Sequence, residues 1–213
     1  MWKQLVLALA VLGLSLPVFA SSQPAKAKRG PEEMVKSVTS QLLSEVQQDK
    51  ESLKKNPDAV YKLVDRIVLP HFDFHYMTQL VMGRYWRQAN DQQKKQVTDA
   101  FRQMLVRTYS NALLSYDHQK LEYKPYRGKP GATDATVNMS IVPEDGQPIP
   151  VSYRLYLDNQ GHWLVYDVTV DNISLVTNYR TTFADVIRSD GIDGLIKKLH
   201  HKQIKSVKPT QHG

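Results

Sequence analysis

WLVYDVTVDNISLVTNYR, residues 163–180, is the stretch of sequence that decides the fold. Its first half alternates like a β-strand, in which successive side chains point to opposite sides. Strict alternation places Trp163 and Val165 on one side and Leu164, Tyr166, Val168 and Val170 on the other. Because both sides are apolar, we expect both faces of this strand to be covered. Asn172 and Ser174 end the alternation, and Asn178 is the predicted N-cap of a helix that begins at Tyr179.

The stretch before residue 163 also has a period of two. Three segments alternate in this way, residues 121–123, 137–141 and 151–157. Turn residues separate them, with Glu144–Gly146 before the third segment and Asp158–Gly161 before Trp163. Short turns between successive strands predict an antiparallel meander with one apolar face and one largely polar face.

Helical patterns flank the predicted strands on both sides. Apolar residues recur at helical spacing in the following segments: 31–53, 57–68, 74–81, 90–116, 178–188 and 192–201. Helices first, strands second and helices last predict an α+β fold, with helices packed on one face of a curved antiparallel sheet. Such a sheet and its helices form a cone that is able to hold a cavity.

The N-terminus is typical of a secretory signal peptide. Lys3 is followed by an apolar run at residues 5–16 that is too short to span a bilayer, and Val18-Phe19-Ala20 resembles a cleavage site. No cysteine follows, so lipoprotein processing is not expected. We therefore divide the chain into four parts: a signal peptide at 1–20, a disordered linker at 21–30, one domain at 31–202 and a disordered basic tail at 203–213.

Composition narrows the possible functions. The 213 residues carry a formal net charge of +7 and contain no cysteine, which excludes disulfides, thiol chemistry and cysteine-ligated metals. Much of the basic excess lies near the two ends of the chain. Basic ends favour solubility, or attraction to anionic membrane surfaces. An exported chain is not expected to bind nucleic acid.

Two groups of residues are candidate centres for chemistry. His71, Asp73 and His75 have a spacing that allows a zinc site on a helix, but no further ligand supports them, and a helix start capped by Asp73 is favoured. Asp167, beside Tyr166, is a candidate general base inside a cone. The favoured alternative is a structural carboxylate paired with a backbone group or an arginine. We therefore predict no catalytic residue and no metal.

The apolar residues expected between sheet and helices form either a packed core or the lining of a cavity, and periodicity leaves both open. Methionine and tyrosine suit either role. The candidate lining residues are Phe72, Met77, Leu80, Phe101, Met104, Leu105, Tyr109, Leu113, Val137, Met139, Val151, Tyr153, Leu155, Val165, Val168, Ile173, Phe183 and Ile187.

Several segments, taken in order, resemble one known family. They are IVLP (67–70), GRYW (83–86), AFRQMLVRTYSNALLSY (100–116), PVSY (150–153), the stretch 163–180 and GIDGL (191–195). Together they resemble the MlaC family of periplasmic phospholipid-binding proteins, also called the toluene-tolerance family, over about residues 33–202.

The resemblance implies an NTF2-like cone that holds the acyl chains of a glycerophospholipid and leaves the headgroup outside. It implies a monomeric periplasmic carrier without cofactors, with Tyr109 at the position of the family's gating tyrosine. The implied partners are an outer-membrane lipoprotein–porin complex and an inner-membrane ABC transporter complex with a substrate-binding ring. The implied role is to maintain outer-membrane lipid asymmetry.

Two alternatives remain beside the lipid carrier. One is an enzyme on the same cone that uses Asp167 and Tyr166, and the other is a periplasmic adaptor with a solid core. Native mass spectrometry separates them, because only a carrier is expected to be purified with lipid bound.

Overall fold

The computed structural model describes residues 29–116 and 119–201. The predicted signal peptide, most of the linker and the predicted basic tail lie outside these residues. The helical segments before the sheet are α1 (Pro31–Gln48), α2 (Lys50–Lys55), α3 (Pro57–Ile67), the 3₁₀ helix η1 (Leu69–His71), α4 (Phe74–Met82), the 3₁₀ helix η2 (Gly83–Arg87) and α5 (Asp91–Leu114). The sheet and the last helix follow as β1 (Lys120–Tyr123), β2 (Asp134–Val142), β3 (Ile149–Leu157), β4 (Trp163–Val170), β5 (Ile173–Ser174) and α6 (Leu175–His200).

The strands form the predicted antiparallel meander, in the order β1-β2-β3-β4-β5. β5 was not predicted. It pairs back onto β4 through a two-residue turn at Asp171 and Asn172, whose φ angles are +50° and +63°. Positive φ at both central residues matches the right-handed twist of the strands, and Asp and Asn tolerate it better than most residues. This turn brings the chain directly to the start of α6.

Local sequence explains where the earlier helices begin. Pro31 occupies the first turn of α1, as predicted. The side chain of Asn56 accepts a hydrogen bond from the Ala59 amide and caps α3. At α5, the Asn90 side chain accepts from the Gln93 amide, and the Gln93 side chain accepts from the Asn90 amide. This reciprocal pair is a capping box, and it fixes the start of the long helix.

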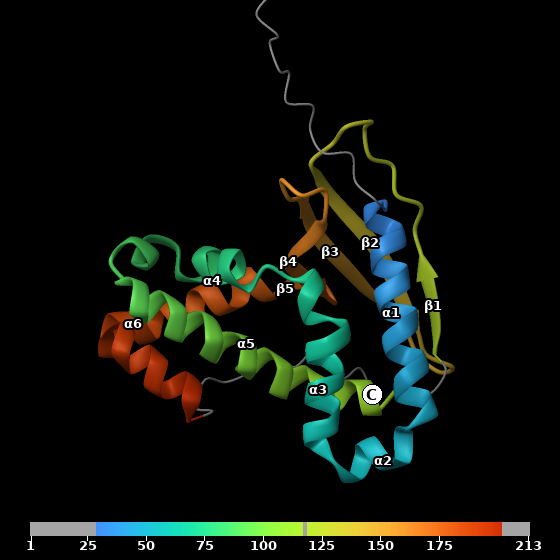
Figure 1. Cartoon of the computed structure of the whole chain (residues 1–213), viewed down its shortest axis with the longest axis horizontal. Helices are drawn as coiled ribbons and strands as arrows, with labels where there is room; N and C mark the ends of the chain where they lie inside the picture. The colour runs from blue at the N-terminus through green and yellow to red at the C-terminus, as the bar shows by residue number, and fades with distance from the viewer. Residues whose placement is uncertain (1–28, 117–118, 202–213) are drawn as a thin grey trace, which may run out of the picture.

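The last helix differs from the prediction at its start and in its middle. Its N-cap is Ser174 rather than Asn178, because the Ser174 hydroxyl accepts from the Thr177 amide at 3.0 Å. The two predicted helices, 178–188 and 192–201, are parts of one helical segment with a break at Gly191. Gly191 has φ +72°, a conformation that glycine adopts without steric cost. The chain therefore turns sharply there, as it does in Figure 1.

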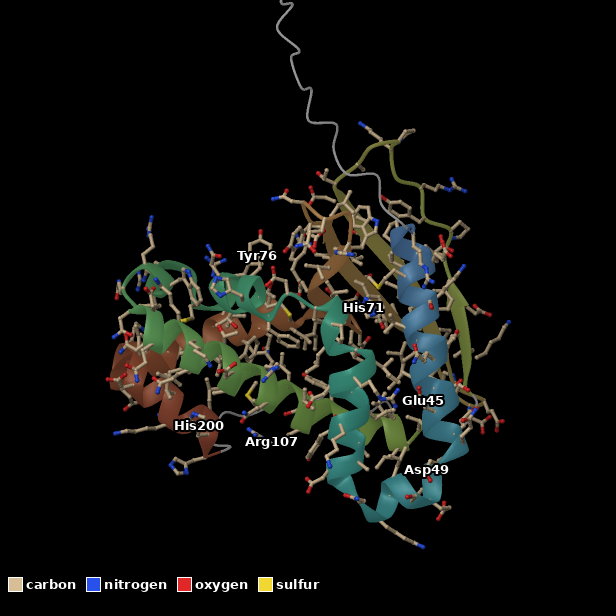
Figure 2. All side chains as sticks on the ribbon, in the orientation of Figure 1. Glu45, Asp49, His71, Tyr76, Arg107 and His200 are labelled. Atoms are coloured by element: carbon tan, nitrogen blue, oxygen red, sulfur yellow. The ribbon has the colours of Figure 1, made fainter. Side chains whose placement is uncertain are left out.

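Helix α1 packs on one face of the sheet, and α4 contacts the other face at the end that carries Tyr156 and Tyr166. Helix α1 lies across β2, whereas α4, α5 and α6 pack on one another beside the sheet, with α4 and α6 in contact with β4 (Figure 1). On the face opposite α1, Tyr76 of α4 (labelled in Figure 2) contacts the rings of Tyr156 and Tyr166. The predicted packing of helices on one face of the sheet is therefore supplemented by α4, for which the aromatic side chains at this end of the other face provide a second apolar surface.

No helix in the described ranges has both the length and the apolar character that a membrane span requires.

Candidate functional site

One face of the sheet is apolar from one end to the other. The register places Val137, Tyr153 and Val168 side by side on β2, β3 and β4. The next row on the same face contains Tyr123, Met139, Val151, Val170 and Ile173. A third row contains Ala135, Leu155 and Val165. We call this surface the inner face. The opposite face carries rows such as Asn138, Ser152, Thr169 and Ser174, which are all polar.

A β-bulge at Tyr166 makes the inner face continuous on β4. Arg154 pairs with Asp167, but its neighbour Leu155 pairs with Val165, so one residue of β4 is extra. A bulge of this kind re-aims the side chains that follow it. Strict alternation predicted Val165 and Val168 on opposite sides, and this was wrong. The bulge returns Val168 and Val170 to the side of Val165.

The buried apolar side chains form three separate clusters, not one continuous core. We call them the helix cluster (α4, η2, α5 and α6, with Tyr166), the sheet cluster (α1 with β2, β3 and β4) and the α1–α3 cluster (α1, α2 and α3). Phe72 packs against both the helix and the sheet clusters, and Val38 against both the sheet and the α1–α3 clusters. A domain of this size usually has one contiguous core.

The helices that face the inner side of the sheet pack mainly on one another. The principal contacts join α3 to α1 and α5, and they join the sheet to α1, η1, α4 and α6. On α5, Leu113 packs against the α1–α3 cluster rather than against the sheet. The inner face is therefore packed against α1 at one side but much less closely against α3 and α5.

Tyr153 is the most informative side chain on the inner face. It lies on β3, the middle strand, between buried neighbours: Val137 is 1% and Leu155 is 0% exposed. Burial raises the pKa of the Tyr153 hydroxyl to about 12. The side chain nevertheless retains accessible surface. Tyr153 is therefore surrounded by buried neighbours but is not itself completely covered by protein atoms.

Tyr109 lies on α5, half-buried, and packs against the helix cluster. Burial raises the pKa of its hydroxyl, which interacts with the hydroxyl of Tyr179. Burial and the neighbouring Tyr109 also raise the pKa of Tyr179, whose ring is completely buried. The ring of Tyr109 is therefore fixed on the side of α6, with its polar end beside another phenol.

The structure divides the predicted lining residues among these surfaces. Met77, Phe101, Met104, Leu105, Phe183 and Ile187 belong to the helix cluster, with Leu80 and Tyr109 packed against it. Val137, Leu155 and Val165 belong to the sheet cluster, with Phe72, Tyr153 and Val168 packed against it. Met139, Val151 and Ile173 lie on the inner face by register, and Leu113 joins the α1–α3 cluster. The expectation that all of them meet at one sheet–helix interface was too simple.

Sequence reasoning missed several inner-face residues. Tyr123 and Val170 share a row with Met139 and Val151 and remain half-buried. The period-two pattern could have found Tyr123, because it lies directly opposite Met139 in a meander. Val170 was assigned to the other side because the bulge leaves no clear mark in the sequence.

Asp167 has a structural environment, in agreement with the favoured interpretation. It is 2% exposed, and its carboxylate accepts from the Ser174 hydroxyl at 2.7 Å and from the Val176 amide at 3.1 Å. Arg154 lies 4.0 Å away and stacks on Tyr166. The carboxylate thus links β4 to the first turn of α6, where a negative charge is stabilised by the helix dipole.

The histidines do not lie on one helix face. His71 ends η1 and His75 lies in α4, where its ring meets Trp86 edge-on at 5.0 Å. Asp73 caps α4 by accepting from the Tyr76 amide, as predicted. Burial, together with Arg29 and His162, lowers the pKa of His71. Within residues 29–116 and 119–201, no three acidic or histidine side chains are grouped closely enough to hold a metal ion.

The comparisons with known proteins agree with this geometry. The family model described as MlaC protein matches residues 36–201. The toluene tolerance protein ttg2D of Pseudomonas putida is 32% identical over 78% of this chain and 77% of its own. The intermembrane phospholipid transport system binding protein MlaC of Haemophilus influenzae is 23% identical over 92% of this chain and 93% of its own.

A solved structure has the same fold. The phospholipid-binding protein from Ralstonia solanacearum, in complex with a phospholipid, superposes with a TM-score of 0.76 and 32% identity, covering 82% of this chain and 97% of that chain. The match extends over the helices and the open antiparallel sheet, which confirms the predicted α+β, NTF2-like fold. On the family match and on these relatives, the chain belongs to the MlaC family.

Proposed function

We propose that this protein is a phospholipid carrier, which holds acyl chains between the inner face of the sheet and helices α1, α3 and α5. The observation that carries the proposal is Tyr153, a deeply placed side chain on the middle strand that still has accessible surface. The division of the core into three clusters supports it. So does the phospholipid bound by the Ralstonia solanacearum relative.

The positions of the inner-face residues indicate which side chains would line the acyl-chain site. The half-buried inner-face residues Tyr153, Val168, Val170 and Ile173 would contact the acyl chains directly. The helix cluster would act as a wall behind them, with Tyr109 at its edge. An apolar surface whose few polar groups are tyrosine hydroxyls suits hydrocarbon and carries no charged group with which to bind a headgroup. The headgroup is therefore proposed to stay outside.

The cellular role is proposed from the relatives and from the sequence. The Haemophilus influenzae relative is named for intermembrane phospholipid transport. With the predicted signal peptide, this supports a periplasmic protein, folded over residues 31–202, that shuttles lipid between outer- and inner-membrane complexes and helps to maintain lipid asymmetry. The carrier does not act as an enzyme, and the contacts of Asp167 within the fold account for that carboxylate.

Native mass spectrometry of the mature protein tests the proposal. A carrier is expected to be purified with the added mass of a phospholipid, and organic extraction should release that lipid and leave a folded protein. A protein that carries no lipid after purification, and takes none from vesicles, would contradict the carrier and favour the adaptor. Turnover that Asp167→Asn abolishes would favour the enzyme.

A further inference from the structure

The surface formed by η2 and the first half of α6 carries arginines without acidic partners. Arg84, Arg87 and Arg180 are exposed, and within residues 29–116 and 119–201 none of them forms an ion pair with a carboxylate. Arg84 and Arg87 are three residues apart on a 3₁₀ helix, so they lie on the same side of it. Positive charge is therefore concentrated on this surface without local neutralisation.

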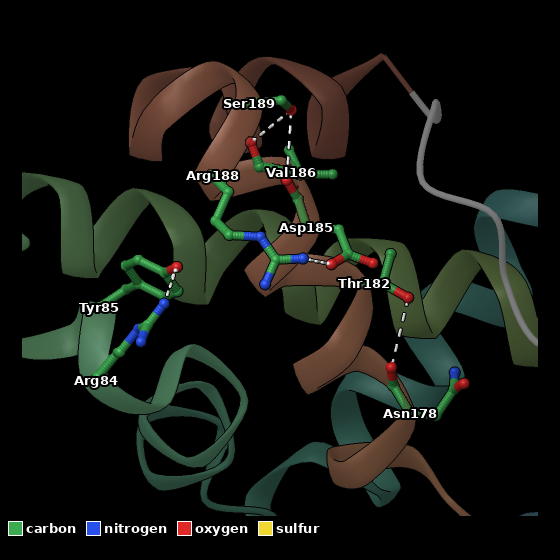
Figure 3. Close-up of polar contacts among 8 residues, drawn as sticks. All are labelled: Arg84, Tyr85, Asn178, Thr182, Asp185, Val186, Arg188 and Ser189. Carbon is green, nitrogen blue, oxygen red and sulfur yellow. Dashed lines mark hydrogen bonds and ion pairs between the residues drawn. The ribbon is translucent and has the colours of Figure 1, made fainter.

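Arg84 is held in place by an aromatic side chain. Its Nη2 donates to the Tyr85 hydroxyl at 2.9 Å, and its guanidinium carbon lies 4.9 Å from the centre of the Tyr85 ring (Figure 3). The ring is only 8% exposed, so it provides a fixed support. A cation stacked on a ring keeps its charge and its remaining N–H donors available.

Arg180 is held against the backbone of the neighbouring residue, Gly83. Gly83 has φ +54°, and a Cβ atom built there would lie 3.1 Å from Nη2 and 3.2 Å from Nε of Arg180. The absence of a side chain at residue 83 therefore leaves room for the guanidinium group. Since Gly83 directly precedes Arg84, the two arginines project from adjacent parts of one surface.

Two other arginines, Arg188 and Arg66, have a different environment. In Figure 3, Arg188 is joined to Asp185 by an ion pair, and elsewhere Arg66 is joined to Glu45. Those pairs largely neutralise their own charge at the surface. Arg84 and Arg180 are positioned by a phenol ring and by a glycine, which leave the positive charge uncompensated.

We propose that Arg84 and Arg180 form a docking site for the phosphate groups of phospholipids at a membrane surface. The planar guanidinium group matches phosphate oxygens through two parallel hydrogen bonds, and two such groups on one surface would engage neighbouring headgroups. A membrane rather than an acidic protein is favoured because it presents phosphates at every position, and because the basic residues near the two ends of the chain would add to the attraction. This site lies apart from the inner face and deepens the proposed carrier function.

Vesicle co-sedimentation tests the docking site with the full mature chain. The probe is vesicles that contain phosphatidylglycerol, with vesicles of phosphatidylcholine alone as the reference. A basic side chain near an anionic surface contributes about fivefold to binding, so the double variant Arg84→Gln/Arg180→Gln is expected to bind about 25-fold more weakly. The matched control is Arg127→Gln, an exposed arginine on the loop between β1 and β2, away from α4 and α6 (Figure 1). It should bind like the wild type.

A second variant tests whether Tyr85 positions Arg84, without changing the net charge of the protein. Tyr85→Phe keeps the ring and the net charge but removes the hydroxyl that accepts from Arg84. Weaker vesicle binding in this variant supports a positioned site, and unchanged binding would show that Tyr85 does not position Arg84. Wild-type binding by the double variant, or an equal loss in Arg127→Gln, would overturn the docking site.

Two further measurements on the same variants test the docking site and the carrier proposal separately. Circular dichroism reports whether each variant is folded, and native mass spectrometry reports its bound lipid. Lipid occupancy should be the same in the wild type and in all of these variants, because none of the changed residues lies on the inner face. A double variant that is folded but purified without lipid would overturn the separation of the two sites.

Discussion

A single charge placed on the inner face should empty the protein of lipid, whereas the same charge on the next residue should not. Val168 lies on the inner face beside Tyr153, and Thr169 lies on the polar face beside Ser152. Both are half-buried residues of β4. Val168→Asp and Thr169→Asp therefore form a matched pair, with the same new side chain on opposite faces of one strand.

The magnitude follows from the environment that an acyl chain would create. A carboxylate covered by hydrocarbon without a partner costs at least about 3 kcal/mol, which corresponds to a loss of more than about 100-fold in affinity. In the lipid-free protein, water in the internal space would solvate the same carboxylate. Val168→Asp is therefore expected to fold and to lose lipid, and Thr169→Asp to keep both.

Native mass spectrometry for lipid and circular dichroism with heating for the fold provide the assay. If the interior is instead a solid core, Val168→Asp should unfold the protein, because the carboxylate has no water to reach. A folded Val168→Asp protein with full lipid occupancy would refute the placement of acyl chains on the inner face. An equal loss of lipid in Thr169→Asp would refute it as well.

Three further predictions concern Asp167, Tyr109 and His71. Asp167→Asn should lower the free energy of unfolding by about 2 kcal/mol in urea titration, because it weakens the buried contacts with Ser174 and Val176, while lipid content stays unchanged. Tyr109→Glu should give a folded protein with much less bound phospholipid, and full occupancy would remove Tyr109 from the site. Burial lowers the pKa of His71, so the unfolded chain binds the extra proton more readily, and stability should fall as the pH drops below about 6.5. Urea titrations across this range should show a smaller fall for His71→Gln, and an equal fall would assign the effect to other groups.

The sequence predicts the elements of this fold well, because each depends on local signals. Asn56 and Asn90 cap helices where they were expected to begin or close to it, and the turns at Asp158–Gly161 and Glu144–Gly146 separate strands as predicted. The start of α6 was placed four residues late. Ser174 is a good N-cap, but it also belongs to the short strand β5, which was not predicted, so the first residue of α6 was not recognised.

The bulge at Tyr166 shows where local reasoning fails. Nothing in the residues 163–170 requires an extra residue at that point, since Val, Tyr and Val all favour a strand. The bulge is supported by contacts made far along the chain: Arg154 stacks on Tyr166, and Asp167 reaches back to Ser174 and Val176. Those contacts decide which side chains join the inner face, and they exist only in the folded protein.

The distinction between core and lining could not be predicted for a related reason. Leu113 and Val168 were equally good candidates by periodicity, yet Leu113 packs among α1, α2 and α3, and Val168 lies on the sheet. Which of them borders a space depends on how far α3 and α5 are held from the sheet. That separation is set by packing between helices, and hydrophobic periodicity within one helix does not report it.

The proposed carrier must exchange its lipid with a membrane rather than store it permanently. Two acyl chains contain roughly 30 methylene groups, each worth about 0.8 kcal/mol on leaving water, so the gross gain is of the order of 20 kcal/mol. A bilayer offers nearly the same gain, so what matters to a carrier is the small difference between the two environments. Half-buried residues such as Tyr153 and Val170 provide contact without the tight packing that would trap the lipid. In the proposed carrier the acyl chains must not cross water, so we expect release to require a docked acceptor. A surface that holds the protein at the membrane would make that exchange faster without changing its equilibrium.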